Sequence, residues 1–297
     1  MAVRERLVTF YGFSRGTQAL LSVAQPLTVA LLAPGHPPVW RFVVLAVASL
    51  AAFASVIALN DLLDTGLDRQ RRGELDLPDI ESAGGRHPLA QGRLSLRAGV
   101  TWVAALGLLT VVLLALLGRV CVVLFFVAAV LEVAYCLLAT ATCGKTVVSG
   151  IMVAGGGWVG WFAMTGEFDP LRLGLVALWL AAWEIGGRNI PNDLADVDED
   201  ARLGIRTVPV VFGARTAAAV AAAALTVAAA AVLALLCYAE VGPLGIVGAV
   251  LALGYTVFVP ARRLLRRPDA AGALAAFNRA SFHPPVILLV TVVFTSA

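Results

Sequence analysis

The chain has 297 residues, of which 60% are hydrophobic and 14% are charged, with a formal net charge of +3. A soluble globular domain contains about 45–50% apolar and about 25% charged residues, so this composition argues against a water-soluble protein. One helix needs roughly 20 apolar residues to cross a bilayer, and the length leaves room for many such spans. We expect a lipid bilayer around the chain and no nucleic-acid partner.

Nine apolar segments with few or no charged residues predict nine transmembrane helices. They are 16–40, 42–60, 98–118, 120–143, 146–166, 173–187, 216–239, 241–261 and 280–297. These segments lack the alternation of apolar and polar residues that marks an outer-membrane barrel. The first segment is longer than the apolar part of a signal peptide and contains Pro26, so we interpret it as a span. The prediction is an all-α, polytopic membrane protein.

Two acidic stretches follow the second and the sixth predicted spans. They read NDLLDTGLD at 60–68 and NDLADVDED at 192–200, and they agree at five of nine positions. Both have the spacing D-x-x-D-x-x-x-D, which puts three carboxylates on one face of a helix. The carboxylates are Asp61, Asp64 and Asp68 in one stretch and Asp193, Asp196 and Asp200 in the other. The stretches belong to long polar segments, about 61–97 and 188–215, which we predict to cap a single domain covering 1–297.

The positive charges predict the orientation of the chain. If the nine spans alternate, 19 of the 22 Lys and Arg residues fall on one side, and only Arg41, Arg119 and Arg172 fall on the other. Basic residues collect on the cytoplasmic side of a membrane. We therefore expect the N-terminus and both acidic stretches in the cytoplasm and the C-terminus outside, in the plasma membrane if the source is bacterial.

The acidic triplets suggest a metal site. Three carboxylates on one helix face repel one another, and a helix C-terminus disfavours negative charge further. Hard oxygen ligands suit Mg²⁺, which is commonly bound by carboxylates together with substrate phosphates. A solvated acidic face at the membrane boundary is the simpler alternative. The repeated spacing favours a site for two or more Mg²⁺ ions, with all six aspartates as ligands.

Several cations and amides near the triplets are candidates to bind a diphosphate. Arg can contact phosphate oxygens in a bidentate manner, whereas Lys acts as a point charge. Cytoplasmic arginines are also expected from topology alone, but Lys145 is the sole charge in its short loop. The candidates are Asn60, Arg86, Arg93, Lys145, Asn192, Arg202 and Arg206.

Two glutamates, Glu132 and Glu184, lie inside predicted spans. An ionisable residue inside a membrane is a functional candidate by default. Glu184 precedes Asp193 by nine residues, so it could project deeper into the same cavity and accept a proton or stabilise a cation. The alternative for both is a protonated side chain that forms a hydrogen bond between helices.

These motifs resemble the UbiA superfamily of intramembrane prenyltransferases. The stretch 60–68 matches that family's N-D-x-x-D-x-x-x-D, and Asp196 and Asp200 match its D-x-x-x-D. RHPLAQGRLS at 86–95 is similar to R-P-L-x-x-G-x-[IL]-S, and DEDARLGIRTVPVVFG at 198–213 looks like the segment that follows the second motif. The resemblance extends over the whole chain.

The resemblance implies nine helices around a central apolar cavity and Mg²⁺ ions that bridge the two motifs to a prenyl diphosphate. Loss of diphosphate would give an allylic cation, which a lipophilic or aromatic acceptor captures. Asp61, Asp64 and Asp196 would then be catalytic, and Glu184 is a further catalytic candidate. A terpene cyclase, in which a double bond of the substrate captures the cation, is the alternative. A transporter with an acidic cation site is less favoured, because both triplets lie at span ends on one side.

Two features depart from the family pattern. His87 stands where the family usually has Arg before Pro-Leu, although Arg86 is adjacent. The segment 69–86 is longer and more acidic than the resemblance suggests. Both departures lie in the predicted cap, so the sequence leaves open the acceptor and the length of the prenyl chain.

Overall fold

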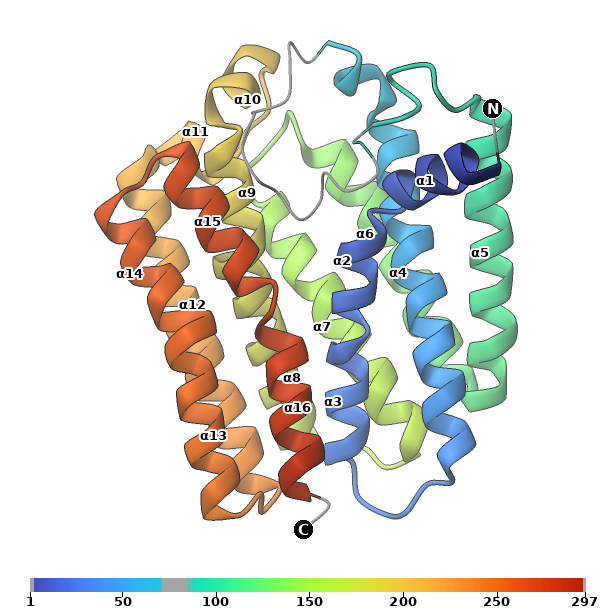
Figure 1. Cartoon of the computed structure of the whole chain (residues 1–297), viewed down its shortest axis with the longest axis vertical. Helices are drawn as coiled ribbons and strands as arrows, with labels where there is room; N and C mark the ends of the chain where they lie inside the picture. The colour runs from blue at the N-terminus through green and yellow to red at the C-terminus, as the bar shows by residue number, and fades with distance from the viewer. Residues whose placement is uncertain (1–2, 71–84, 86, 296–297) are drawn as a thin grey trace.

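The computed structural model describes residues 3–70, 85 and 87–295, and its regular elements in this part of the chain are all helical. Figure 1 shows long helices packed side by side, with shorter helices at one end. The elements are α1 (Val3–Phe13), α2 (Gly16–Ser22), α3 (Ala24–Leu32), α4 (Val39–Asp68), α5 (Leu96–Leu117), α6 (Arg119–Leu138), α7 (Lys145–Met164), α8 (Pro170–Trp183), the π-helix η1 (Glu184–Asn189), α9 (Ile190–Ala195), α10 (Val197–Leu203), α11 (Val208–Phe212), α12 (Ala214–Tyr238), α13 (Pro243–Leu253), the π-helix η2 (Gly254–Phe258), α14 (Val259–Arg266), α15 (Ala270–Ala280) and α16 (His283–Thr295).

The all-helical membrane architecture is confirmed, but the number of full-length spans differs from the prediction. Within the described residues, seven helices rather than nine are long and apolar enough to cross a membrane. The predicted span 16–40 is the shorter apolar stretch Gly16–Leu32, which breaks at Val23 between α2 and α3. The predicted span 173–187 corresponds to α8, which has 14 residues and continues into η1, where Glu184 and Arg188 interrupt the apolar run.

Both π-helices end just before a proline. Proline has no N–H to donate, and its ring crowds the carbonyl of the preceding turn. The helix widens into a π turn just before each proline: η1 precedes Pro191, and η2 precedes Pro260. The first widening lies within the polar stretch that leads to the second acidic triplet, and π turns are frequent at functional sites.

The two chain ends lie at opposite ends of the helix bundle (Figure 1). The N-terminus shares its end with α10 and with the C-terminal end of α4, whereas the C-terminus lies at the other end. Of the segments predicted as cap loops, residues 71–84 and 86 lie outside the described residues, whereas 188–215 is largely helical. The stretch 61–68 forms the last turns of α4, and α9 to α11 occupy most of 188–215.

The helix α7 passes through the middle of the bundle, in contact with α3, α6 and α8. Its glycine-rich run 155–160 permits close approach to a neighbouring backbone, as small residues do between membrane helices. A Cβ atom on Gly160 would clash with the backbone carbonyl oxygen of Pro26 in α3. A Cβ atom on Gly155 would meet nothing within 4 Å.

Replacing Gly160 with alanine is therefore expected to destabilise the bundle by about 1–3 kcal/mol, which is typical of overpacking. The added methyl group would push α3 away from α7, and a backbone atom cannot move aside as a flexible side chain does. Thermal unfolding in detergent measures the effect. Gly155→Ala is the matched control, because it adds the same methyl group to the same helix in open space. Equal unfolding temperatures for the two variants would contradict this account of the glycine run.

Candidate active site

The first acidic triplet lies on the last two turns of α4. The helix runs without interruption to Asp68, so Asp61 and Asp68, seven residues apart, share one face. Asp64 is half-buried and lies about 60° around the helix from Asp61, on the same side of the helix. The hydroxyl of Thr65 donates to the Asp61 carbonyl at 2.7 Å and stays within the helix. The chain thus presents three carboxylates from one rigid element.

The second triplet spans a bend between two short helices. Asp196 leaves helical geometry, with φ −100° and ψ 12°, and separates α9 from α10. Asp193 and Asp200 are buried, whereas Asp196 is half-buried. The helix α10 ends at Leu203, and the following Gly204 has a φ of +71°, the left-handed conformation typical after a helix C-terminus.

Carboxylates of both triplets line one small polar pocket of about 110 Å³. We call it the acid pocket. Its charged lining consists of Asp64, Asp68, Asp193, Asp196, Asp200, Arg15, His87 and Lys145. Asn60, Tyr135 and Asn192 also contribute to it. Five aspartates thus face two permanent cations and one histidine, so the negative charge is in excess.

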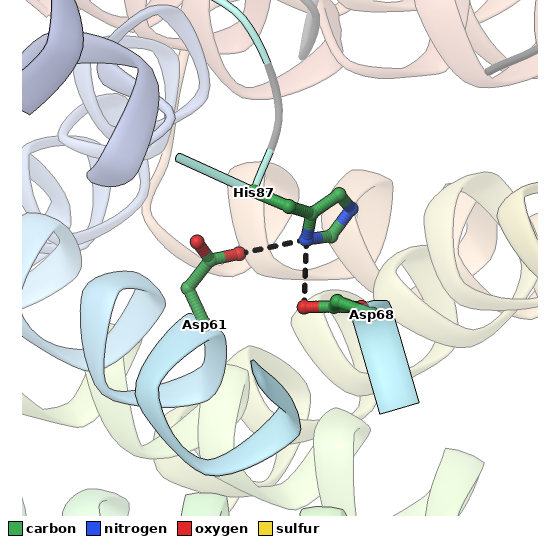
Figure 2. Close-up of side chains that lie close together, drawn as sticks. All are labelled: Asp61, Asp68 and His87. Carbon is green, nitrogen blue, oxygen red and sulfur yellow. Dashed lines mark hydrogen bonds and ion pairs between the residues drawn. The ribbon is translucent and has the colours of Figure 1, made fainter. Parts of the chain in front are cut away.

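Asp61 joins the acid pocket through His87. Nδ1 of His87 lies 3.0 Å from Oδ1 of Asp61 and 2.8 Å from Oδ2 of Asp68, and Figure 2 shows the imidazole between the two carboxylates. Burial lowers the pKa of His87, but hydrogen bonds to Asp61 and Asp68 raise it, and the net shift is above the ordinary value. His87 therefore lies within hydrogen-bond distance of two carboxylates on one helix face.

Lys145 provides the cation beside the second triplet. It is the first residue of α7 and is 5% exposed. Its Nζ lies 3.6 Å from Oδ1 of Asp193 and donates to the hydroxyl of Tyr135 at 3.3 Å. Asn189 also donates to this hydroxyl, at 3.2 Å. A buried ammonium group is stable only when such partners compensate its desolvation, so these contacts fix the position of Lys145.

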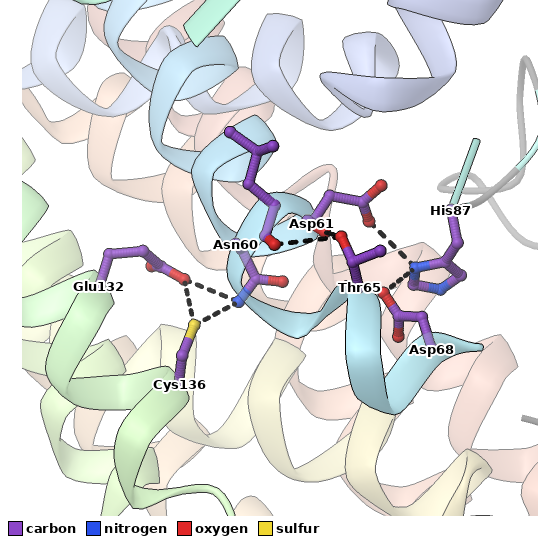
Figure 3. Close-up of polar contacts among 8 residues, drawn as sticks. Asn60, Asp61, Thr65, Asp68, His87, Glu132 and Cys136 are labelled. Atoms are coloured by element: carbon purple, nitrogen blue, oxygen red, sulfur yellow. Dashed lines mark hydrogen bonds and ion pairs between the residues drawn. The ribbon is translucent and has the colours of Figure 1, made fainter. Parts of the chain in front are cut away.

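A second polar group connects α4 to α6. Asn60 Nδ2 donates to Oε1 of Glu132 at 2.8 Å and lies 3.3 Å from Sγ of Cys136 (Figure 3). Glu132 is buried, with 4% of its surface exposed. This network holds the residue next to Asp61 against α6. It supports the structural alternative for Glu132, a hydrogen bond between helices.

A larger cavity of about 210 Å³ adjoins the acid pocket. We call it the apolar cavity. Arg15, Asn60, Tyr135 and Asn192 line both spaces, so the two are neighbours. Its apolar lining includes Phe53, Phe125, Val153, Val159 and Phe277. A chain of hydrocarbon could therefore extend from a group held in the acid pocket.

The tryptophans of α7 and α8 mostly serve packing rather than line the cavity. Trp161, Trp179 and Trp183 are at most 1% exposed. Their N–H groups donate to Glu167 O, His283 Nε2 and Ala280 O, respectively, at 2.8–2.9 Å. The aromatic side chains that line the cavity are those of phenylalanines and Tyr135 instead.

Glu184 lies in the wall of the apolar cavity and not in the acid pocket. It accepts a hydrogen bond from Ser149 at 3.0 Å, and its Oε2 is 3.8 Å from Nε of Arg188. The guanidinium group of Arg188 lies over the rings of Trp183 and Phe277. The π-helix η1 thus places a polar cluster on a largely apolar wall.

The structure separates the predicted phosphate-binding residues into two groups. Asn60, Lys145 and Asn192 line the acid pocket. Arg93, Arg202 and Arg206 are exposed and lie outside its lining, and Arg202 pairs with Glu199 on its own helix. Arg86 lies outside the described residues.

The sequence interpretation missed two residues of the pocket. Arg15 lines both spaces, with a left-handed φ of 42° at the turn between α1 and α2. Its signal in the sequence was an isolated charge directly before the first apolar segment. His87 was noted only as a departure from a family pattern, and its partners became visible only in three dimensions.

A comparison with family models decides the classification. The model described as the UbiA prenyltransferase family matches residues 21–282, which is most of the chain. The chain belongs to this family. No curated protein sequence matches it significantly.

Solved structures of UbiA homologues share the fold. An apo structure of a homologue from Aeropyrum pernix K1 has a TM-score of 0.77 at 19% identity and covers 93% of this chain and 97% of that one. An Archaeoglobus fulgidus homologue bound to DMAPP and Mg²⁺ has a TM-score of 0.69 at 17% identity, covering 97% and 99%. A digeranylgeranylglyceryl phosphate synthase gives 0.68 at 15% identity, covering 98% and 99%.

The residues of the acid pocket fit a hard divalent cation. Oδ2 of Asp61 is buried and has no hydrogen-bond partner among the described residues, and a buried charged oxygen without a partner is costly. The excess of aspartate over cations in the pocket would be relieved by divalent ions. Carboxylate oxygens are the ligands that Mg²⁺ prefers.

Proposed function

We propose that this protein is a Mg²⁺-dependent prenyltransferase that ionises a prenyl diphosphate and transfers the prenyl group to a lipophilic or aromatic acceptor. The observation that carries the proposal is the position of the acid pocket, lined by five of the six motif aspartates, next to the apolar cavity. Membership of the UbiA prenyltransferase family supports it, as does the homologue bound to DMAPP and Mg²⁺.

The aspartates are proposed to hold the metal ions. Asp64, Asp68, Asp196 and Asp200 face the acid pocket, and Asp193 does so beside Lys145. Bound Mg²⁺ would act as a Lewis acid that stabilises the charge developing on the leaving diphosphate. Lys145 and Arg15 are proposed to bind diphosphate oxygens directly, while Asn60 and Asn192 orient the group from the side shared with the apolar cavity.

The apolar cavity is proposed to hold the prenyl chain. Its phenylalanine and valine side chains exclude water from the carbon that develops positive charge. The faces of Phe53, Phe125 and Tyr135 can also stabilise a nearby cation electrostatically. Glu184, in contact with Ser149 and near Arg188, is proposed to accept the proton that the acceptor loses.

We also propose that 1–297 forms a single domain with the acid pocket on the cytoplasmic side and the C-terminus outside. The strong bias of Lys and Arg toward one side supports this orientation. The opposite positions of the two chain ends in Figure 1 are consistent with it. Labelling of single introduced cysteines at the two ends of the chain, in intact cells, tests the orientation.

Incubation with prenyl diphosphates of increasing length tests the reaction itself. The purified protein, Mg²⁺ and a membrane lipid extract as the acceptor source are expected to give a prenylated product identified by mass spectrometry. In the absence of an acceptor, only slow release of prenyl alcohol is expected. A cyclic hydrocarbon formed from the diphosphate alone would overturn the transferase assignment in favour of a terpene cyclase. Failure to consume any chain length would overturn both.

A further inference from the structure

We propose that His87 is a ligand of a metal ion held with Asp61 and Asp68, so that this site accepts Mn²⁺, Co²⁺ or Zn²⁺ more tightly than Mg²⁺. The inference rests on the proposed function, because it adds a nitrogen ligand to the metal site proposed there. It assigns a role to the residue at which this chain departs from the arginine usual in the family.

The geometry of the three ligand atoms fits one metal ion. Nδ1 of His87 lies 3.0 Å from Oδ1 of Asp61 and 2.8 Å from Oδ2 of Asp68, and these atoms all lie within 4.8 Å of one another. In an octahedral site with bonds of about 2.1 Å, adjacent ligand atoms are about 3.0 Å apart and opposite ones about 4.2 Å. The two distances from Nδ1 therefore match the spacing of adjacent octahedral positions, with the imidazole between the two carboxylates (Figure 2).

The surrounding structure holds His87 in this place. Its φ of 51° is left-handed, which is uncommon for a residue with a side chain and persists where the surroundings enforce it. The carbonyl of His87 accepts a hydrogen bond from Gln91, and the carbonyl of Pro88 accepts from Arg93 and Leu94. Asp61 and Asp68 belong to one helix, so the third ligand is the one supplied from outside that element.

A second observation points to a further ligand at the same place. Asp61 is 4% exposed, and its Oδ2 has no hydrogen-bond partner among the residues that the structure describes. A metal ion at Oδ1 would place positive charge next to this oxygen and compensate its burial. Neutral imidazole would present the Nδ1 lone pair to the metal, with its proton on Nε2.

The ligand set predicts the metal preference. Imidazole nitrogen suits Mn²⁺, Co²⁺ and Zn²⁺ better than it suits Mg²⁺, which is selected by oxygen ligands alone. The competing explanation is that His87 acts only as a protonated bridge between two carboxylates. The distances of a hydrogen bond and of an octahedral edge coincide, so a direct measurement of nitrogen coordination is needed.

Electron spin echo envelope modulation of Mn²⁺ bound to the full-length protein gives that measurement. The chain contains only three histidines. His36 lies between α3 and α4, and His283 is fully buried against Trp179 and Thr256. After removal of any histidine tag, wild-type protein is expected to show ¹⁴N modulation from imidazole that changes when histidine is labelled with ¹⁵N. His87→Gln, which keeps a polar side chain, is expected to bind Mn²⁺ without this modulation.

His87→Arg provides a second, independent readout. It restores the residue usual in the family and removes the imidazole ligand, and it is expected to lower the Co²⁺-to-Mg²⁺ affinity ratio by about tenfold or more in competition titrations. Mn²⁺ bound to wild-type protein without histidine modulation, or an unchanged affinity ratio in His87→Arg, would overturn the inference. In either case, Mg²⁺-dependent diphosphate release would leave the proposed function standing. Absence of diphosphate release with every metal would overturn that function instead.

Discussion

Replacing Asp64 or Asp196 with asparagine is expected to slow diphosphate release by about a thousandfold or more. Each substitution removes one carboxylate charge from the acid pocket while keeping the size of the side chain. Removing a single group that stabilises developing charge costs about 10²–10³ in rate, and the loss of a metal ligand adds to this. Release of diphosphate from a prenyl diphosphate, followed with a coupled pyrophosphatase assay, measures the effect.

Asp198→Asn is the matched control for Asp196. Asp198 lies on the exposed side of α10, two residues along the same acidic run, and does not line the acid pocket. Its rate of diphosphate release is expected to remain within a factor of about two of wild type, since surface substitutions have small effects. Equal losses of activity in Asp198→Asn and Asp196→Asn would contradict this prediction. They would show that the rate depends on the total charge of the acidic run and not on which carboxylates line the acid pocket.

Replacing Lys145 with methionine is expected to destabilise the fold and to abolish turnover. The substitution removes a buried ammonium group whose Nζ lies 3.6 Å from Asp193. Breaking a buried ion pair by removing one partner typically costs about 3–5 kcal/mol, because the remaining charge stays buried. It also removes a cation proposed to bind the diphosphate, for which a loss of about 10²–10³ in kcat/KM is expected.

The double variant Lys145→Met with Asp193→Asn separates the two effects. Removing both charges leaves no uncompensated carboxylate at this position, so the unfolding temperature is expected to return most of the way to wild type. Turnover is expected to remain lost, because neither charge is restored. A double variant that regained turnover along with stability would show that Lys145 acts only in folding.

The helical membrane architecture could be predicted from the sequence because long apolar segments have few alternatives in a bilayer. The errors concern segments that are too short or too polar to span by themselves. The first predicted span ends early at Leu32, before a proline-rich loop, and α8 leads into the polar π-helix η1. The two π-helices could be anticipated from the prolines that follow them, whereas their contacts depend on packing between helices.

The composition of the acid pocket could be predicted in part. Repeated acidic spacing identified the carboxylates, because repulsion within a triplet requires compensation. The exclusion of Arg202 from the pocket follows from helical phase, since two residues on a helix rotate by about 200°, and Asp200 and Arg202 thus face opposite sides of α10. Arg15 and His87 enter the pocket from a turn and a loop, whose positions in space local sequence patterns do not fix.

Metal-dependent release of diphosphate by the purified, metal-free protein tests the central claim most directly. The protein is stripped with a chelator and incubated with geranyl diphosphate and the membrane lipid extract while Mg²⁺ is titrated. We predict no release without added metal, and release that rises and saturates with Mg²⁺ in wild type but not in Asp64→Asn or Asp196→Asn. Release that is independent of divalent metal, or that both variants retain, would contradict the account.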